Sequence, residues 1–355
     1  MEKIQLLNAD GARKMLEGLD IKEINSLDFS NVETINFAGM RALLFARQQG
    51  YKINIINANE QVATMFENAG VTHYISICRA PVKIDLTHFI QSGEGFSSIT
   101  YNSEDGDSML KLIKENFPDS LSEKEKMIAT AALQVGVPTP LPGPIVTTGK
   151  QRGIIFERIV NKKSFSRAIA DEPENYADYA IRFAKMCRQL HTTECNTAVF
   201  PNVADFYEDA ISRATLFNDA EKKKMRDFLH SVPAATTCLH GDMHIGNVIT
   251  TGKEDLWIDM SEFSYGNPNF DMAMFYIACT QDSEEFTMEY YHVNNEMMLK
   301  FWKIFACEYY GIKESELETV SERLKPYAAL RMVYFTTLGS IQPRNLAFIR
   351  EFLNS

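Results

Sequence analysis

Residues 238–250 read CLHGDMHIGNVIT, and residues 256–259 read LWID. The two short apolar runs that end these stretches predict a β-hairpin with its turn at residues 252–255. Asn247 and Asp259 would then lie beside each other at the open end of the hairpin, with Asp242 only five positions before Asn247. Any one of these residues could simply cap backbone groups in a polar turn. The three together favour a reactive site, because Asn and Asp oxygens suit Mg²⁺.

The spacing of Asp242 and Asn247 is the D-x-x-x-x-N spacing of a kinase catalytic loop, in which the aspartate accepts the proton of the attacking hydroxyl. A zinc site is the competing interpretation, since His240 and His244 are four positions apart and could share a metal on a helix. The glycines between and after them disfavour a helix, and no glutamate adjoins His240. A serine nucleophile is not supported, because no G-x-S-x-G stands between a strand and a helix.

Length and composition limit the classes of protein. The chain has 355 residues, which favours two domains. No apolar run approaches the roughly 18 residues that span a bilayer. The six cysteines are scattered without a C-x-x-C pair, and the N-terminus lacks a secretory signal, so we expect a cytoplasmic protein without disulfides. The net charge of −11 disfavours a nucleic-acid partner, because phosphate binding needs a basic face.

The first 80 residues alternate strand and helix patterns. Apolar residues predict strands at residues 24–29 and 52–56, and helices at residues 40–50 and 60–68. This β-α-β-α order is typical of an α/β domain, in which helices cover a small sheet. Residues 81–86 contain a proline and no helical period, so we expect a linker there and a domain that ends at residue 80.

Residues 29–71 of this first domain resemble the STAS domain, the fold of anti-sigma-factor antagonists. The family pattern Asp-Ser-Ser/Thr-Gly at the start of the first helix reads Asn36-Phe37-Ala38-Gly39 here. The hydroxyl that phosphorylation would modify is absent, so this chain cannot be switched in that way. The resemblance implies a module that binds a protein partner or a second copy of the chain. The alternative is that Ala38 and Gly39 merely allow a tight turn from strand to helix.

The segment after the linker contains a possible phosphate loop. A strand at residues 87–91, a turn at residues 92–95 and a returning strand at residues 96–102 would place Gly93 and Gly95 at the turn. Backbone N–H groups approach an anion closely where no Cβ intrudes. An ordinary glycine-containing hairpin is the alternative.

Residues 109–113 predict a buried strand that contains one lysine, Lys111. A lysine flanked by apolar residues usually extends to the surface, but after a glycine turn it also stands where a kinase keeps the lysine of its α- and β-phosphates. A helix is predicted over residues 122–136, and Glu125 in its first turn could pair with Lys111. Glu123 is the competing partner, and a carboxylate favoured by the helix dipole is the alternative role for Glu125.

The blocks HGDMHIGN (residues 240–247) and WIDMSEFSYGNPNFDMA (residues 257–273) resemble the aminoglycoside phosphotransferase and choline kinase family. The resemblance implies the α+β bilobal fold of the protein kinases over residues 87–355, with an N-lobe at residues 87–160 and a C-lobe at residues 161–355. The expected fold class is therefore an α/β STAS-like domain followed by a protein-kinase-like domain.

The resemblance also assigns a role to each matching residue. Asp242 becomes the catalytic base, Asn247 and Asp259 become the magnesium ligands, and Asp271 and His191 become structural residues. The residues implied for nucleotide binding are Lys111 and its partner Glu125, the glycines Gly93 and Gly95, and the hinge residues Glu157 and Ile159 after the strand that begins at Gly153.

Two departures from the protein-kinase pattern favour a small-molecule kinase. His240-Gly-Asp242 stands in place of His-Arg-Asp, and Asp259-Met-Ser stands in place of Asp-Phe-Gly. The acceptor is the open question. Carboxylates in the region that would bind it could attract a cation, although a solvated helix face explains the same residues: Asp282, Glu284, Glu285 and Glu289.

We therefore expect an ATP- and Mg²⁺-dependent phosphotransferase that acts on a hydroxyl of a small molecule, such as an aminoglycoside, a choline-like alcohol or a sugar. The alternative is a regulatory protein that senses nucleotide and signals through the STAS-like domain. A protein kinase is disfavoured because no Ala-Pro-Glu follows Asp259.

Overall fold

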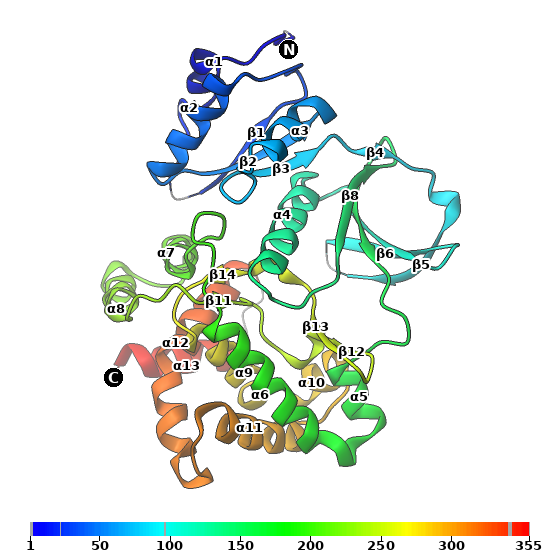
Figure 1. Ribbon diagram of the computed structural model, residues 1–355. Helices are drawn as coiled ribbons and strands as arrows, with labels where there is room; N and C mark the ends of the chain where they lie inside the picture. The colour runs from blue at the N-terminus through cyan, green and yellow to red at the C-terminus, as the bar shows by residue number, and fades with distance from the viewer. Residues whose placement is uncertain (1–2, 22, 96, 340–342, 355) are drawn as a thin grey trace. The chain divides into compact units, whose positions relative to one another are not determined.

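The computed structural model describes residues 3–21, 23–95, 97–339 and 343–354 (Figure 1). The chain divides into two compact units. The first comprises residues 1–160 and 196–200, and the second comprises residues 161–195 and 201–355. Within the described ranges, no helix is both long and apolar enough to span a membrane.

The first unit begins with a small domain that contains the four expected elements in β-α-β-α order and adds a helix before them and a strand after them. Three parallel strands form one sheet in the order β1-β2-β3, and helices flank it. Helix α2 begins at Phe37, three residues earlier than predicted, because the side chain of Asn36 accepts the N–H of Gly39 at 2.9 Å and caps the helix. The elements are α1 (Ala9–Met15), β1 (Ile24–Asp28), α2 (Phe37–Gln48), β2 (Lys52–Ala58), α3 (Glu60–Asn68) and β3 (Ser76–Arg79).

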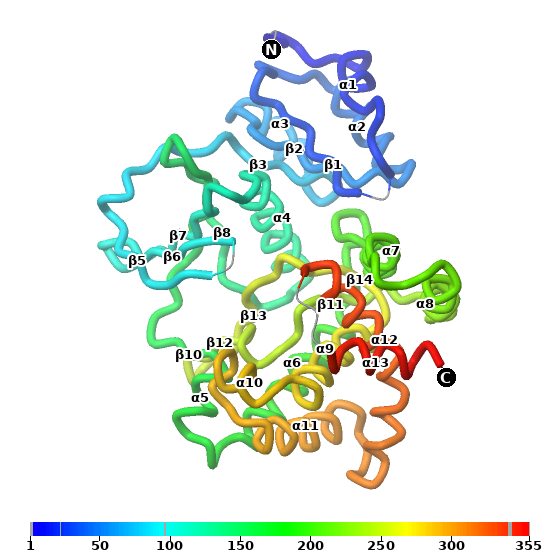
Figure 2. The backbone as a smooth tube through the Cα atoms, turned by 180° about the vertical axis from the view of Figure 1, so that it is seen from behind, coloured from blue at the N-terminus to red at the C-terminus, as the bar shows by residue number. Residues whose placement is uncertain are grey.

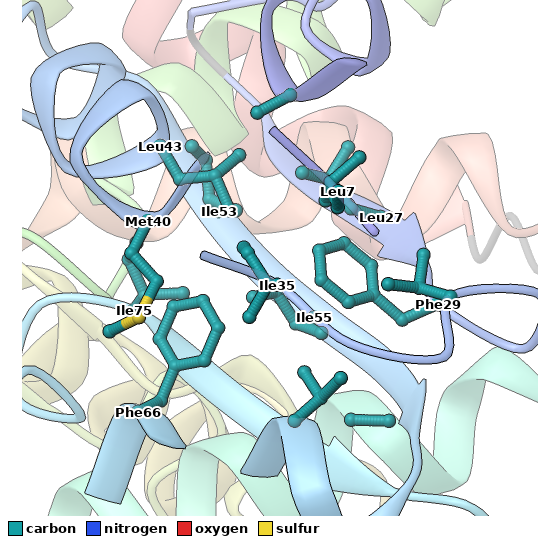
Figure 3. Packing of buried hydrophobic residues seen from close by; sticks show 14 of the residues in the cluster. Leu7, Leu27, Phe29, Ile35, Met40, Leu43, Ile53, Ile55, Phe66 and Ile75 are labelled. Atoms are coloured by element: carbon teal, nitrogen blue, oxygen red, sulfur yellow. The ribbon is translucent and has the colours of Figure 1, made fainter. Parts of the chain in front are cut away.

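A single hydrophobic core holds this domain together (Figure 3). Ile53 and Ile55 of β2 point to the same face of the sheet, as alternate strand residues must, and they meet side chains from the helices and from the loop after β1. Phe29 and Phe66 are fully buried in it. The domain thus has a core of its own, built only from residues before the kinase-like segment.

The remainder of the first unit is a six-stranded sheet with one long helix, α4 (Ser120–Gln134), packed against it. The strand order is β4-β8-β9-β7-β6-β5, and all neighbours are antiparallel except β4 and β8. Strand β4 lies in the segment expected as a linker, which is therefore part of the sheet. The strands are β4 (Val82–Lys83), β5 (Phe89–Glu94), β6 (Ser98–Ser103), β7 (Ser108–Ile113), β8 (Pro142–Thr147) and β9 (Arg152–Glu157).

The predicted turn at residues 92–95 is wrong in position. Residues up to Glu94 belong to β5, and the chain reverses after Gly95, whose N–H donates to Ser98 O at 2.8 Å. The register shifts between Gln91 and Gly93, so that Ser92 is the extra residue of a bulge, and Gly93 still pairs with Thr100 within the ladder. Phe96, predicted to open the returning strand, lies outside the described residues.

The second unit is mainly helical. Helices α6, α9 and α11 pack together around rings of Phe183, Phe275 and Phe305, whose centroids are 4.7–5.3 Å apart. Short strands carry the loops of interest: β10 (Lys163–Ser164), β11 (Cys238–Leu239), β12 (Val248–Thr250), β13 (Asp255–Trp257) and β14 (Ser264–Tyr265). The helices are α5 (Phe165–Asp171), α6 (Tyr176–Thr192), α7 (Val203–Arg213), α8 (Asp219–Ser231), α9 (Asn269–Thr280), α10 (Glu284–Tyr290), α11 (Asn295–Tyr310), α12 (Leu317–Thr337) and α13 (Pro343–Asn354).

A close backbone approach in the first domain yields a testable prediction. A Cβ added to Gly39 would lie 2.5 Å from the carbonyl oxygen of Leu7 and 3.0 Å from Ile35 Cγ1. We expect Gly39→Ala to lower the free energy of unfolding by about 1–3 kcal/mol, the usual cost of overpacking. Urea unfolding of the full chain measures this change in the free energy of unfolding. Gly11→Ala is the control, because the nearest contacts of its Cβ would be side-chain atoms, Leu7 Cδ1 at 3.0 Å and Asn8 Oδ1 at 3.5 Å. Equal stability of both variants would contradict the prediction.

Candidate active site

Lys111 and Glu125 lie together in the first unit. Lys111 Nζ donates to Glu125 Oε1 at 2.8 Å, from the middle of β7 to the second turn of α4. Their side chains are only 15% and 12% exposed, so the pair is held in a mostly dry environment. Glu123, the competing partner, is instead in the first turn, is almost fully buried, and binds Arg152. A mostly buried lysine with a fixed carboxylate partner is suited to hold an anion in a defined place.

The strand register places Gly93 in line with Lys111. Gly93 pairs with Thr100 on β6, and Thr100 pairs with Lys111 on β7. Directly opposite residues of antiparallel strands point to the same face, so Lys111 and Thr100 share a face of the sheet. Gly95 lies one residue beyond the end of β5, on the same hairpin. The glycines and the lysine thus belong to one connected patch of sheet.

The predicted hinge residues lie at the end of β9. Glu157 is the last residue of the strand, and its backbone and its side chain both bind Leu141: Glu157 N donates to Leu141 O at 3.0 Å, and Leu141 N donates to Glu157 Oε1 at 2.8 Å. Ile159 follows in the irregular segment and is half-buried. The Glu157 carboxylate is thus engaged with the backbone of the segment that precedes β8.

In the second unit, Asp271 fixes the backbone of the loop that carries Asp242. Its carboxylate accepts the N–H groups of His240 at 2.7 Å and Gly241 at 2.8 Å, and it lies 3.1 Å from His191 Nε2. Burial alone would raise the pKa of Asp271, but His191, His240 and these bonds lower it. The other ring nitrogen of His191 meets Tyr309 Oη at 2.7 Å. Asp271 and His191 thus have structural roles in this geometry.

His240 is fully buried, and both of its ring nitrogens are used within the loop. Nδ1 accepts the N–H of Asp242 at 3.3 Å, and Nε2 meets the carbonyl oxygen of Ile258 at 2.9 Å. The histidine therefore has no nitrogen left for a metal, which removes the zinc interpretation. In the described parts of the chain, no group of three or more His, Cys, Asp or Glu side chains is arranged as a metal site.

Gly241 is required by the fold of the loop. Its φ is +85°, and a Cβ there would lie 2.3 Å from the carbonyl oxygen of Glu262. The chain therefore cannot place an arginine at this position, and the His-Gly-Asp sequence follows from the close approach of the loop to the segment after Asp259.

Two basic side chains lie beside the half-exposed carboxylate of Asp242. His244 Nε2 lies 3.5 Å from Oδ2, and Arg331 Nη2 donates to Oδ1 at 3.4 Å. Arg331 comes from α12, is 3% exposed, and also donates to Glu262 at 2.7 Å. Burial would raise the pKa of Asp242, but His244 and Arg331 lower it below its ordinary value. The carboxylate is therefore ionised at neutral pH.

Arg331 is a site residue that the sequence did not indicate. It belongs to a long helix with no motif of its own and lies 89 positions from Asp242. One signal was present: an arginine within the otherwise apolar run Ala-Ala-Leu-Arg-Met-Val needs a buried partner. That signal does not reveal which carboxylate the partner is.

Asn247 and Asp259 are carried by the two ends of the predicted hairpin. Ile258 N donates to Asn247 O at 3.0 Å, which sets Asp259 next to this pair. Asn247 Nδ2 donates to the backbone oxygen of Asp242 at 2.8 Å and to its Oδ2 at 3.2 Å. Among the contacts of the described residues, the amide oxygen of Asn247 is thus the atom left to bind a metal. Asp259 has a left-handed backbone, with φ of 57°, a strained conformation that often marks a functional position.

This donor set fits Mg²⁺. One amide oxygen and one carboxylate are hard oxygen ligands, and Mg²⁺ commonly takes only one or two protein ligands while keeping waters and phosphates. Asn247 is buried, and its side chain is fixed by its bonds to Asp242. The chemistry of these residues therefore agrees with the expected magnesium site.

Of the four carboxylates considered for a cationic acceptor, only Asp282 lies near the Asp242 loop. It interacts electrostatically with His244 and lies 3.8 Å from Arg344 Nη2. Burial raises the pKa of Asp282 to about 6. The ring of Tyr291 lies 5.3 Å from that of His244. The other three are exposed on α10, which agrees with a solvated helix face: Glu284, Glu285 and Glu289.

A family model described as the phosphotransferase enzyme family matches residues 89–298. Two solved structures of thermostable mutants of the aminoglycoside phosphotransferase APH(4)-Ia align with 74% of this chain. The apo form is 16% identical, with 94% of its chain covered and a TM-score of 0.52. A ternary complex with ADP and hygromycin B is 15% identical, with 93% covered and a TM-score of 0.50. A choline/ethanolamine kinase family protein from Mesorhizobium loti is 17% identical over 75% of this chain and 85% of its own, with a TM-score of 0.44. No curated protein matches the sequence.

These identities are low, so the aligned structures show a shared fold alone, and the expected protein-kinase-like α+β fold is confirmed. The first 88 residues lie outside the matched family model. The expectation of a small-molecule phosphotransferase is confirmed by the family match, and the chain belongs to the phosphotransferase enzyme family.

Proposed function

We propose that the protein transfers the γ-phosphoryl group of ATP to a hydroxyl of a small molecule, and that residues 1–80 form a STAS-like domain fused to this kinase. The observation that carries the proposal is the loop from His240 to Asn247, in which Asp271 binds two backbone N–H groups just before Asp242 and the Asn247 amide donates to the backbone oxygen and the carboxylate of Asp242. A site held this rigidly is suited to phosphoryl transfer, which depends mainly on positioning and charge stabilisation.

In the proposed reaction, Asp242 accepts the proton of the acceptor hydroxyl, and the oxygen of that hydroxyl bonds to the γ-phosphorus. The bond from that phosphorus to the bridging oxygen breaks, and ADP leaves with its electron pair. Asn247 and Asp259 would hold Mg²⁺, which neutralises developing charge on the phosphates when bound. Lys111, oriented by Glu125, would contact the α- and β-phosphates. The β5–β6 hairpin with Gly93 and Gly95 would cover the phosphates, and the backbone of Glu157 and Ile159 would hold adenine.

The acceptor is proposed as an aminoglycoside, a choline-like alcohol or a sugar. Support comes from the polar groups next to Asp242, namely His244, Tyr291 and Asp282, which suit hydrogen bonds to a hydroxylated molecule. The aligned structure of an aminoglycoside phosphotransferase that contains ADP and hygromycin B is in line with a nucleotide donor and an aminoglycoside acceptor. A nucleotide sensor that signals to a protein partner through the STAS-like domain is the alternative function, and the presence of the additional domain favours it.

Asp242→Asn and Asp259→Ala should separate catalysis from nucleotide binding. Asp242→Asn removes the proton acceptor, so we expect kcat to fall by roughly 10²–10⁴-fold with an unchanged Kd for MgATP. Asp259→Ala removes a metal ligand, so we expect weaker binding of MgATP, on the order of tenfold or more. Titration calorimetry and an ATP-consumption screen over the three acceptor classes measure the two effects.

Asp227→Asn serves as the control for these variants, because Asp227 is exposed on α8 and pairs only with a neighbouring lysine among the described contacts. It should match the wild type in both assays. An equal loss of MgATP affinity in the Asp242 and Asp259 variants would contradict the separate roles. A wild type that binds nucleotide but consumes none with any acceptor would favour the sensor.

Arg331 should be needed for turnover as well as stability. Arg331→Gln leaves the partly exposed carboxylate of Glu262 without its charged partner, so we expect a loss of about 1–3 kcal/mol in the free energy of unfolding and a lower kcat in the folded fraction. Arg331→Lys keeps the charge and should recover stability more than kcat, because a lysine cannot contact both carboxylates through a planar fork. Arg323→Gln, on the exposed side of the same helix, is the control. A lysine variant with wild-type kcat would assign Arg331 to stability alone.

A further inference from the structure

One side chain, Arg152 at the start of β9, joins the first domain to the helix that carries Glu125. Its guanidinium binds the carboxylate of Glu123 in the first turn of α4, and its Nε lies 3.6 Å from the carboxylate of Asp119, the N-cap residue of the same helix. Its Nη1 also donates to Asn57 Oδ1 at 3.2 Å. Asn57 lies at the end of β2, in the first domain.

The other end of this connection is fixed within the first domain. Asn57 has a left-handed backbone, with φ of 57°, and its Nδ2 donates to Asp28 Oδ1 at 2.9 Å. Asp28 ends β1, the neighbouring parallel strand. The pKa of Asp28 is lowered by the bond from Asn57, the bond from Ser30 and the charge of Arg152, against the effect of burial. The side-chain amide of Asn57, which binds Arg152, is therefore held in its orientation at the carboxyl ends of β1 and β2.

A second contact reaches the same turn of the helix. Cys78 on β3 is buried, and its Sγ donates to the backbone oxygen of Glu123 at 3.8 Å. Burial raises the pKa of Cys78 to about 12, so the sulfur keeps its proton and remains a donor. Strand β3 and helix α4 lie side by side in both views of the chain (Figures 1 and 2).

Helix geometry separates the two glutamates of α4. Residues two positions apart in an α-helix are rotated by about 200°, so Glu123 and Glu125 point in nearly opposite directions. Glu125 meets Lys111 on β7, and Glu123 meets Arg152 and the first domain. Glu123 is 2% exposed, and a buried carboxylate without its partner would be strongly unfavourable. Moving the first turn of α4 away from Arg152 would leave Glu123 buried without its ion-pair partner, and the free-energy cost of that separation opposes the displacement.

We propose that Arg152 is a positioning residue through which the first domain holds α4 where Glu125 pairs with Lys111. The first domain then acts within its own chain, by supporting the phosphate-binding lysine, and its connection runs from Asp28 and Asn57 through Arg152 to Glu123. The inference rests on the proposed role of Lys111 in nucleotide binding.

The test uses the full chain with Asn57→Gly, Arg152→Gln, Arg152→Lys and the double variant Asn57→Gly/Arg152→Gln. Glycine accepts the left-handed backbone of residue 57 and removes only the amide. Arg13→Gln is the matched control, because Arg13 is an exposed arginine of the first domain that pairs with Asp10. Two quantities are measured: the Kd and KM for MgATP, and hydrogen exchange of the amides of residues 120–134.

We expect Asn57→Gly and Arg152→Gln to weaken MgATP binding by about fivefold or more, the usual lower range of coupling between sites. Exchange in α4 should be faster, the KM for the acceptor should change little, and Arg152→Lys should recover part of the affinity. The double variant should equal Arg152→Gln alone, because both changes break one connection. Arg13→Gln should match the wild type.

Wild-type MgATP affinity in Asn57→Gly and Arg152→Gln would overturn the inference, even if both variants were less stable. A wild type that binds no nucleotide would overturn the proposed function instead. In that case the hydrogen exchange of the α4 amides alone tests the inference. Faster exchange in Asn57→Gly than in Arg13→Gln would support the inference, and equal exchange in the two variants would overturn it.

Discussion

The buried carboxylate of Asp271 is the constraint on which the loop from His240 to Asn247 depends. An ion in the protein interior is tolerated only when its charge is met by donors, and two backbone N–H groups and His191 supply them. These bonds fix the peptide groups of His240 and Gly241, and the direction of Asp242 follows from them. Asn247 then takes its position from Asp242. One carboxylate that touches no substrate thus sets the geometry of the proposed base and of one proposed metal ligand.

In the first unit, helix α4 is also positioned by carboxylates whose charges are met by fixed partners, here two carboxylates instead of one. Glu125 faces the lysine on β7, while Glu123 faces Arg152 and the first domain. Because both ion pairs are largely removed from water, contacts with solvent do not readily replace either of them. The helix is held from two opposite sides, which is the basis for the proposed influence of the first domain on Lys111.

The sequence predicted what lies close together along the chain. The hairpin after Asn247, the strand of Lys111 and the helix of Glu125 were each defined by local patterns, and the structure contains all three. It did not predict contacts between distant segments: Arg331 meets Asp242 across 89 positions, and the Arg152 contact with Asn57 spans 95. The turn near Gly93 was misplaced because a bulge in one strand leaves no periodic signal.

The glycine at position 241 and the arginine at position 331 are best understood together. The backbone of Glu262 comes so close to Gly241 that no side chain fits, which excludes the arginine that protein kinases carry there. A guanidinium is nevertheless present beside Asp242, since Arg331 enters from α12 and binds Glu262 at the same time. The positive charge next to the proposed base therefore comes from a distant helix, and α12 becomes part of the proposed site. Changes in the packing of α12 then alter the surroundings of Asp242 directly, whereas in a loop with its own arginine they would not.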